Sequence, residues 1–200
     1  MAIPWIVSVR DNAPTIRGDG VFLRPAAMTD FDDWSRLREA SRSFLTPWEP
    51  VWPADDLTRG AFRRRVKRHT EEIERDESYA FLLFREADER LLGGLTLGQI
   101  RRGVAQAATV GYWMGAAHAG RGYMARGLRA TIAYAFSTLR LHRLEAACLP
   151  SNERSVHLLE SVGFQPEGLA RSYLCIDGRW RDHRLFAMLE GDPIPGPRVR

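Results

Sequence analysis

The sequence predicts an α/β (α+β) fold in which helices flank a mixed, mostly antiparallel central sheet. Segments with strand or helix patterns follow one another in the order strand, two helices, three strands, helix, strand, helix and two strands. The 200 residues suit a single domain, and a compact chain of this length buries roughly 70% of its unfolded surface. No second core is needed to accommodate this order of elements.

The first half of the chain predicts one strand and two helices, with a stiff connection between the helices. Residues 20–26 read as a strand, and Thr29 or Asp30 then caps a helix. The residues that recur at the three- or four-residue spacing of a helix are Phe31, Trp34, Leu37 and Arg38. Three prolines in the aromatic connection 44–53 are expected to bar regular helix and strand. The second helix spans 57–76, and its apolar side consists of Leu57, Phe62, Val66 and Ile73.

Three strands and a long helix follow. Residues 78–86 and 90–100 predict a hairpin with a short polar turn, and residues 107–115 predict the next strand. The helix that includes 126–139 turns one apolar stripe toward the sheet. The stripe consists of Met124, Leu128, Ile132, Phe136 and Leu139.

The last part of the domain predicts a strand at 143–150, a helix at 152–164 and a hairpin at 169–189. The helix begins with Asn152 as its N-cap and stops near Gly163. The hairpin turn is expected at the pair Asp177 and Gly178, because such a pair adopts the left-handed conformations that a tight turn requires.

Outside these elements we expect an irregular N-terminal arm at residues 1–15 and a mobile, proline-rich tail at residues 192–200. The composition, with 44% hydrophobic and 27% charged residues, is ordinary for a globular chain. No uninterrupted apolar run reaches the about 18 residues of a membrane span, and the start of the chain lacks the basic flank of a signal peptide. We therefore expect a cytoplasmic protein with no membrane contact.

The net charge of +4 suits an anionic cofactor. The basic run at 63–69 precedes acidic residues of the same helix, and pairs such as Arg68 with Glu72 explain much of it. No direct nucleic-acid binding is therefore expected. Cys148 and Cys175 are too few for a disulfide framework, and neither they nor the five histidines show metal-ligand spacing. No metal site is predicted.

The most informative stretch is GYWMGAAHAGRGYMA, from Gly111 to Ala125. Gly120 and Gly122 allow the backbone to approach a ligand closely, and the first turn of the next helix presents N–H groups without intrahelical partners. The helix dipole and the side chains of Arg121 and Arg126 add positive charge there. The stretch therefore predicts a diphosphate site. Other phosphate loops do not fit, because GxxxxGK[ST] and the third glycine of the dinucleotide fingerprint are missing.

This stretch resembles the acyl-coenzyme A loop of the GNAT superfamily of N-acetyltransferases, and NERSVHLLESVGF at 152–164 resembles the helix that follows in that family. FLTPWEPV at 44–51 and EGLARSYLCIDGRWRDH at 167–183 are similar to the Rim-type ribosomal-protein alanine N-acetyltransferases, in particular the RimJ branch. The resemblance implies a GNAT acyl-CoA N-acyltransferase domain over residues 16–191. It also implies acetyl-CoA, with coenzyme A as the product.

The resemblance places the cofactor against one strand, the glycine loop and the start of the later helix. In the family the strand that corresponds to 111–114 splays from its neighbour at a bulge, and its free backbone groups hold the pantetheine arm and polarise the thioester. Core packing explains the side chains of Tyr112 and Trp113 equally well. The expected cofactor residues are Tyr112, Trp113, Met114, Gly120, Arg121, Gly122, Tyr123, Met124, Ala125, Asn152 and Ser155.

The expected catalytic residues are Ser155, Glu49 and Glu167. Leu159 stands where the wider family often has the tyrosine that protonates the departing thiolate, so Ser155 is the remaining candidate. A thiol of pKa about 8.5 leaves readily near pH 7, so Ser155 need only hydrogen-bond the sulfur. An N-terminal amine of pKa about 8 loses its proton for roughly 1 kcal/mol at neutral pH, so a carboxylate suffices as base. Glu49 is the first candidate and Glu167 the second, although each is also explained as a surface acid.

Aromatic side chains in the proline-rich connection and the late hairpin predict an acceptor groove, although packing alone would also explain them. The expected acceptor residues are Phe44, Trp48, Glu49, Trp52, Tyr173 and Trp180. The resemblance implies direct attack in a ternary complex by a protein N-terminus, namely the alanine or serine of a ribosomal protein, with ribosome association as a possible consequence. Two alternatives stay open. One is an acetyltransferase for a small amine such as an antibiotic or polyamine, which an acidic, enclosed pocket would favour; the other is a non-catalytic, CoA-binding ribosome-associated factor.

Overall fold

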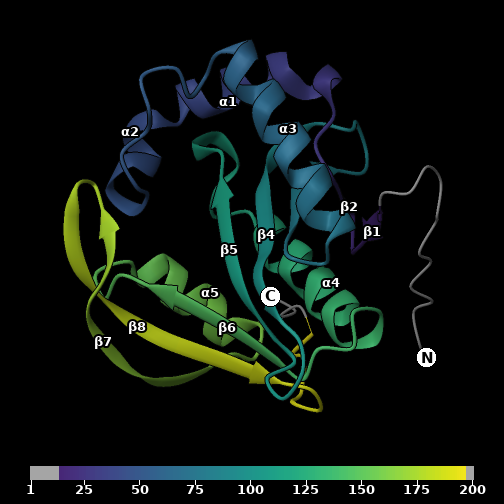
Figure 1. The fold of residues 1–200 in the computed structure, drawn as a ribbon, viewed down its shortest axis with the longest axis vertical. Coiled ribbons are helices and arrows are strands. Elements are labelled where there is room, and N and C mark those ends of the chain that lie inside the picture. Colours follow the sequence, from purple (N-terminus) through teal and green to yellow (C-terminus); the bar gives the residue numbers. More distant parts are fainter. Residues whose placement is uncertain (1–13, 197–200) are drawn as a thin grey trace.

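The computed structural model describes residues 14–196, so most of the predicted N-terminal arm lies outside the described residues. Eight strands form one sheet in the order β1-β2-β3-β4-β5-β6-β8-β7 (Figure 1). Among the strands of residues 14–196, β5 and β6 alone pair in parallel, and every other neighbouring pair is antiparallel. The strands are β1 (Ile16–Arg17), β2 (Val21–Arg24), β3 (Tyr79–Arg85), β4 (Leu91–Arg101), β5 (Ala107–Met114), β6 (Arg143–Cys148), β7 (Gln165–Ile176) and β8 (Arg179–Leu189).

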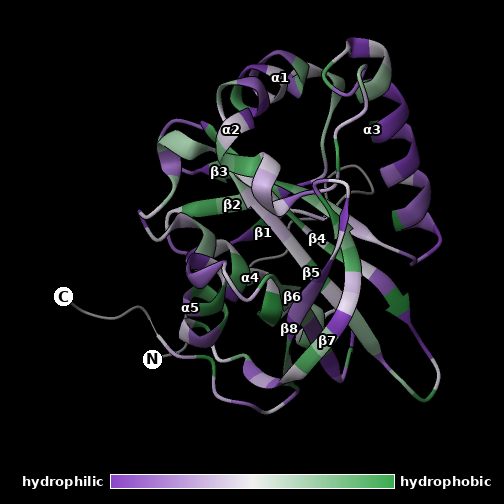
Figure 2. Cartoon of the chain, turned by 90° about the vertical axis from the view of Figure 1, so that its left-hand side faces the viewer, coloured by the Kyte–Doolittle hydropathy of each residue, from purple (hydrophilic) through white to green (hydrophobic). Residues whose placement is uncertain are grey.

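The helices cover both faces of this sheet, with α1 and α3 on one side and α4 and α5 on the other (Figure 2). They are α1 (Phe31–Ala40), α2 (Arg42–Leu45), α3 (Arg59–Glu74), α4 (Tyr123–Ser137) and α5 (Glu153–Ser161). Single 3-10 turns lie at Met28–Asp30, Thr46–Trp48 and Ala116–His118. No helix within residues 14–196 has the length and apolar character that crossing a membrane requires.

The predicted order of elements is confirmed, but the strand β1, the helix α2 and the 3-10 turns were missed. The two-residue strand β1 precedes the predicted first strand and pairs with β2. The connection 44–53 was expected to contain no helix, yet α2 ends within it and a 3-10 turn follows at Thr46–Trp48. Pro47 lies in the first turn of that 3-10 helix, where an N–H has no helical acceptor and its absence costs nothing.

Each face of the sheet has its own apolar core. Trp34 of α1 and Phe62 of α3 pack on one face against β3 and β4. On the other face, all five residues of the predicted stripe pack against the main core, four of them from α4 and Leu139 from just beyond its end. The predicted pair of Arg68 with Glu72 is present on α3, with 3.5 Å between Nε and Oε1.

The predicted cap, stop and turn of the late elements agree with the structure, although β7 begins at Gln165, four residues before the predicted start of the hairpin at 169. The side chain of Asn152 accepts the N–H of Ser155 and caps α5. Gly163 follows α5 with a φ of 106°. The turn between β7 and β8 has φ of 47° at Asp177 and 71° at Gly178, as a two-residue type I′ hairpin requires.

The described part of the C-terminal tail has a contact that the sequence did not predict. The guanidinium of Arg129 on α4 donates from Nε to the carbonyl oxygen of Pro195 at 2.7 Å. A Cβ at Gly163 would lie 2.7 Å from the carbonyl oxygen of Pro193, so the tail passes directly over the end of α5. The mobility expected for residues 192–200 stays a prediction.

β4 and β5 approach each other closely at Gly93, so the stability of the fold should depend on this glycine. A Cβ at Gly93 would lie 2.3 Å from the carbonyl oxygen of Trp113, whereas a Cβ at Gly98 on the same strand would meet nothing closer than 3.8 Å. Gly93→Ala is expected to lower the free energy of unfolding by about 2 kcal/mol, because the backbone must shift to relieve the clash. Gly98→Ala is the matched control, with a change within about 0.5 kcal/mol. Urea unfolding measures both, and equal stabilities would contradict the described packing.

Candidate active site

The two parallel strands of the sheet diverge partway along their length. β5 pairs with β6 from Ala107 opposite Arg143 to Val110 opposite Ala146, and the pairing ends there. β5 nevertheless stays paired with β4 as far as Met114. Figure 1 shows the end of β5 pointing away from β6, and the place where these two strands are no longer paired is called the gap below.

This splay agrees with the expectation from the resemblance, but the bulge lies on a different strand. Gly98 pairs with Thr109 and Arg101 pairs with Ala107, so β4 carries one more residue than β5 over this stretch. Gln99, within the extra length, has a φ of 51°. Pairing between β4 and β5 is regular from Thr109 to Met114. The irregularity therefore lies on β4 before the splay, and the exposed part of β5 is straight.

Hydrogen-bond alternation identifies the backbone groups that face the gap. The N–H of Gly115 donates to the carbonyl oxygen of Leu92 at 2.8 Å, on the β4 side. Because the direction alternates along a strand, Trp113 also faces β4, whereas the N–H and C=O groups of Tyr112 and Met114 face the side that β6 has left. Within the described part of the chain, these groups have no strand partner beyond the last β5–β6 pair.

The glycine loop, residues 115–122, connects this open edge with the start of α4. Gly120 and Gly122 have φ of 74° and 77°, and a Cβ at either position would meet no atom within 4 Å. The first backbone hydrogen bond of α4 runs from the N–H of Arg126 to the carbonyl of Gly122, so the N–H groups of residues 123–125 are left without helical acceptors. Arg121 forms no ion pair within residues 14–196, while Arg126 lies 3.6 Å from Asp19. The loop thus combines open donors with positive charge.

His118 contributes little charge to this loop. Burial lowers the pKa of His118, and the nearby Arg121 and Arg85 lower it further. The imidazole is therefore neutral near pH 7. Its Nδ1 is buried and has no hydrogen-bond partner among the described residues.

A hydroxyl pair spans the gap between β5 and α5. The hydroxyl of Tyr112 lies 2.5 Å from Oγ of Ser155, at the start of α5. Burial raises the pKa of Tyr112, so the phenol keeps its proton throughout the physiological range. Cys148, at the end of β6, also touches Ser155, and burial raises the pKa of its thiol. The thiol therefore lies beside the hydroxyl pair, in a form that reacts poorly.

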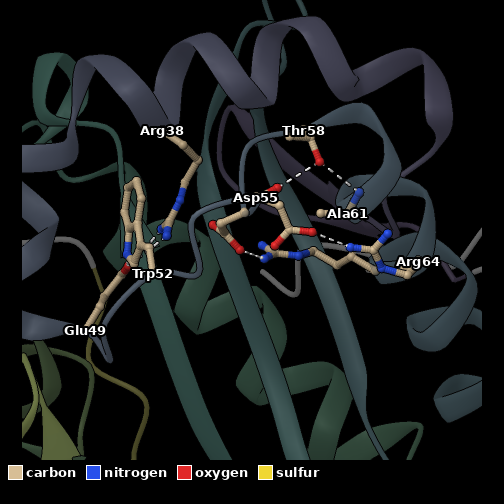
Figure 3. A network of polar contacts seen from close by, with 9 residues as sticks. Arg38, Glu49, Trp52, Asp55, Thr58, Ala61 and Arg64 are labelled. Atoms are coloured by element: carbon tan, nitrogen blue, oxygen red, sulfur yellow. Dashed lines mark hydrogen bonds and ion pairs between the residues drawn. The ribbon is translucent and has the colours of Figure 1, made fainter.

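On the opposite face of the sheet, Glu49 lies in a clamp with Arg38 and Trp52 (Figure 3). The guanidinium of Arg38 donates to both carboxylate oxygens of Glu49, at 2.8 and 2.7 Å, and the indole N–H of Trp52 donates to Oε2 at 2.7 Å. Arg38 is buried between the rings of Trp52 and Trp113, at 4.0 and 4.9 Å from its Cζ. Three donors thus occupy three of the about four acceptor positions of this carboxylate. Its role as a base stays a prediction.

Glu167, the second candidate base, lies elsewhere. Its carboxylate pairs with Arg143, whose strand partner is Ala107 at the start of β5. Tyr112 is five residues further along the strand, on the order of 16 Å away. The structure therefore does not bring Glu167 to the gap.

A groove of about 550 Å³ lies beside the gap, between the proline-rich connection and the β7–β8 hairpin. The hairpin tip is held to the connection by the N–H of Asp177, which donates to the carbonyl of Glu49 at 3.0 Å. The lining residues are Pro47, Trp48, Leu149, Pro150, Ser151, Trp180, Arg181 and Asp182. Ser151 directly precedes the cap of α5, so the groove adjoins the Ser155 end of the gap.

The predicted acceptor aromatics divide among several sites. Trp48 and Trp180 line the groove, whereas Trp52 belongs to the clamp. Phe44 lies under the guanidinium of Arg154 at 5.6 Å, and Tyr173 stacks edge-on with His183 at 5.8 Å.

Comparison with known proteins identifies the family. The family model described as "Acetyltransferase (GNAT) domain" matches residues 21–165. The chain belongs to the GNAT acetyltransferases. As a member of this family it is an acetyl-CoA-dependent N-acetyltransferase, and its mostly antiparallel sheet flanked by helices is the GNAT fold.

Similar proteins match over most of their length. "Probable N-acetyltransferase YjcK" of Bacillus subtilis (strain 168) is 37% identical over 177 residues, which cover 88% of this chain and 98% of that protein. The "[Ribosomal protein uS5]-alanine N-acetyltransferase" of Escherichia coli (strain K12) is 35% identical over 190 residues, covering 94% and 97%. Among solved structures, Mycobacterium smegmatis RimJ in complex with CoA-disulfide has a TM-score of 0.82 at 32% identity, covering 88% of this chain and 86% of that one.

The residues of this GNAT site fit acetyl-CoA. The open edge of β5 supplies backbone donors and acceptors, and the glycine loop offers unpaired N–H groups where no Cβ intrudes. Asn152 and Ser155 lie at the other wall of the gap, although Asn152 also serves as the cap of α5. The side chain of Trp113 points to the opposite face, beside Arg38.

Several residues of the site were not predicted from the sequence. Arg38 was noted only for its helical spacing, although a charged residue beside the apolar positions of α1 was a signal that it has a buried partner. Ser41 gave no signal at all, yet its Oγ accepts the N–H of Ala116 at 2.9 Å and ties α1 to the glycine loop. Asp182 is the third such residue, as it lines the groove.

The loop geometry predicts how substitutions change cofactor affinity. Gly122→Asp is expected to weaken coenzyme A binding at least tenfold, because its carboxylate repels the diphosphate at the helix N-terminus. Gly122→Asn is the matched control, since asparagine has the same shape, tolerates positive φ and carries no charge. Arg121→Ala is expected to have a moderate effect. Calorimetric titration measures all three, and an undiminished affinity of Gly122→Asp would place the diphosphate elsewhere.

Proposed function

We propose that this GNAT enzyme acetylates the N-terminal amine of a ribosomal protein that begins with alanine or serine. The observation that carries the proposal is the groove beside the gap, because it is open and its described lining bears one carboxylate and one guanidinium. Trp180, in its wall, is 68% exposed. An extended polypeptide fits such a groove better than a small polyamine, which an enclosed acidic pocket would favour.

The similarity to the uS5-alanine N-acetyltransferase supports this acceptor, since it extends over 94% of this chain and includes both walls of the groove. An acceptor on a ribosomal protein would bring the enzyme to the ribosome and to the cytoplasm. Acetylation of a small amine is the alternative, and both share the same cofactor residues. A CoA-binding factor without turnover is disfavoured by the family assignment.

We propose a direct transfer in which the backbone of β5 does most of the catalytic work. When bound, acetyl-CoA supplies an activated thioester. The N–H groups of Tyr112 and Met114 point into the gap, where a donor to the developing oxyanion is worth roughly 3 kcal/mol of barrier. The buried, protonated Cys148 thiol is a poor nucleophile, which favours direct transfer over an acetyl-cysteine.

We propose that Ser155 and Tyr112 together stabilise the leaving sulfur. Their hydroxyls lie 2.5 Å apart, and the raised pKa of Tyr112 keeps a proton available to the pair. This pair takes the place of the tyrosine that Leu159 replaces. Because a thiolate leaves readily near neutral pH, we expect Ser155→Ala to cost about tenfold in kcat or less.

We propose that Glu49 assists deprotonation of the acceptor amine through the free position of its Oε1, directly or through a water. Its ion pair with Arg38 fixes the carboxylate beside Trp48, which lines the groove. The demand on this base is small, because deprotonating an α-amine at neutral pH costs roughly 1 kcal/mol, whereas deprotonating a lysine side chain costs nearly 5 kcal/mol.

The acceptor assignment is tested with matched peptides. We expect the enzyme to acetylate a peptide with a free N-terminal alanine or serine much faster than the same peptide with a blocked N-terminus and an internal lysine. Mass spectrometry of the products locates the acetyl group. Faster acetylation of the blocked lysine peptide, or of spermidine, would contradict the proposed acceptor.

The role of Glu49 is tested by substitution and pH. Glu49→Gln is expected to lower kcat far more than it weakens acetyl-CoA binding, and raising the pH should partly restore kcat because more amine is neutral. Arg38→Gln is the control, since it breaks the clamp but leaves the carboxylate. If Arg38→Gln shows the same loss and pH restores neither variant, Glu49 holds the connection in place and is not the base.

A further inference from the structure

β7 carries a large bulge opposite Asp182. Ala170 pairs with His183 and Leu174 pairs with Arg181, so residues 171–173 of β7 lie opposite one residue of β8. Ser172, in the middle of this bulge, has a φ of 45°. Left-handed backbone at a residue other than glycine is uncommon, and bulges beside active sites re-aim side chains. The side chain that this bulge faces is that of Asp182.

The bulge fixes the carboxylate of Asp182. The N–H of Ser172 donates to Oδ1 of Asp182 at 2.8 Å, so a backbone donor that has left the strand ladder is satisfied by this side chain. Oδ2 has no such contact, and no arginine, lysine or histidine within residues 14–196 forms an ion pair with Asp182. One oxygen is therefore anchored and the other is available to a cationic ligand.

The surroundings of this carboxylate suit an ammonium group. Asp182 lines the groove together with Trp48 and Trp180, whose side chains are 37% and 68% exposed. Aromatic faces attract cations, and a carboxylate supplies a charge-assisted hydrogen bond. Arg181, in the same lining, disfavours a second cation nearby. The groove thus matches a single positive charge at the end of a chain.

We propose that Asp182 binds the α-ammonium group of the acceptor, with Trp48 and Trp180 against its sides. This inference rests on the proposed function and extends it by naming the residue that selects a free N-terminus. The acetylated product is a neutral amide and loses both interactions. Asp182 therefore also distinguishes substrate from product and favours release of the product after transfer.

The test measures binding of a peptide with a free N-terminal alanine and of its N-acetylated form, by calorimetry in the presence of coenzyme A. The wild type is expected to prefer the free form by about tenfold or more, as one charged hydrogen bond predicts. Asp182→Asn should abolish the preference, while its amide oxygen still accepts the N–H of Ser172 and preserves the bulge. Asp177→Asn removes a carboxylate from the same hairpin outside the groove and should keep the preference.

Steady-state kinetics with the same variants separate binding from chemistry. Asp182→Asn is expected to raise KM for the peptide about tenfold, with KM for acetyl-CoA and kcat at saturating peptide nearly unchanged. An undiminished preference and KM in Asp182→Asn, while the wild type turns over the peptide, would overturn the role of Asp182 alone. A wild type that acetylates spermidine but no N-terminal peptide would overturn the proposed function itself and, with it, this assignment.

Discussion

The parting of two parallel strands is the constraint on which this structure depends. β5 and β6 share register only from Ala107 to Val110, and β5 continues alone on that side to Met114. Backbone groups without partners are costly when buried, so the open edge of β5 needs a ligand or water to satisfy it. β4 holds the other edge of β5 in place, and Gly93 permits the close contact between them. The strand therefore stays rigid while the backbone groups of Tyr112 and Met114 remain free to hold a ligand.

Contacts between the proline-rich connection and the β7–β8 hairpin hold the two halves of the sheet together around this opening. The connection reaches the hairpin tip through the hydrogen bond from Asp177 to the carbonyl of Glu49, and α2 meets α5 where Phe44 lies under Arg154. Arg38 is a buried charge whose partners are Glu49 and two indole rings. Apolar residues often replace a buried ion pair without loss of stability. The ion pair of Arg38 with Glu49 is therefore better explained as holding the proline-rich connection in position beside the groove than as stabilising the fold.

Features with local signals could be predicted from the sequence, and features that depend on distant partners could not. The cap at Asn152 and the type I′ turn at Asp177 are encoded within a few residues, and the stripe on α4 is encoded by its period. The contact of Tyr112 with Ser155 joins a strand and a helix that are far apart in sequence, and Asp182 faces Ser172 because of a bulge in β7 that the turn at Asp177 does not encode. Glu167 illustrates the same limit, because its sequence neighbourhood gave no sign that Arg143 holds it at the far end of the sheet.

Hydrogen exchange of the β5 amides, with and without coenzyme A, tests the central claim most directly. In the free protein, the amides of Tyr112 and Met114 should exchange much faster than those of Gly111 and Trp113, because only the latter two face β4. Saturating coenzyme A should slow Tyr112 and Met114 at least tenfold and leave the other two nearly unchanged. Equal protection of all four amides in the free protein, or no change on binding, would contradict the claim that the open edge of β5 holds the cofactor.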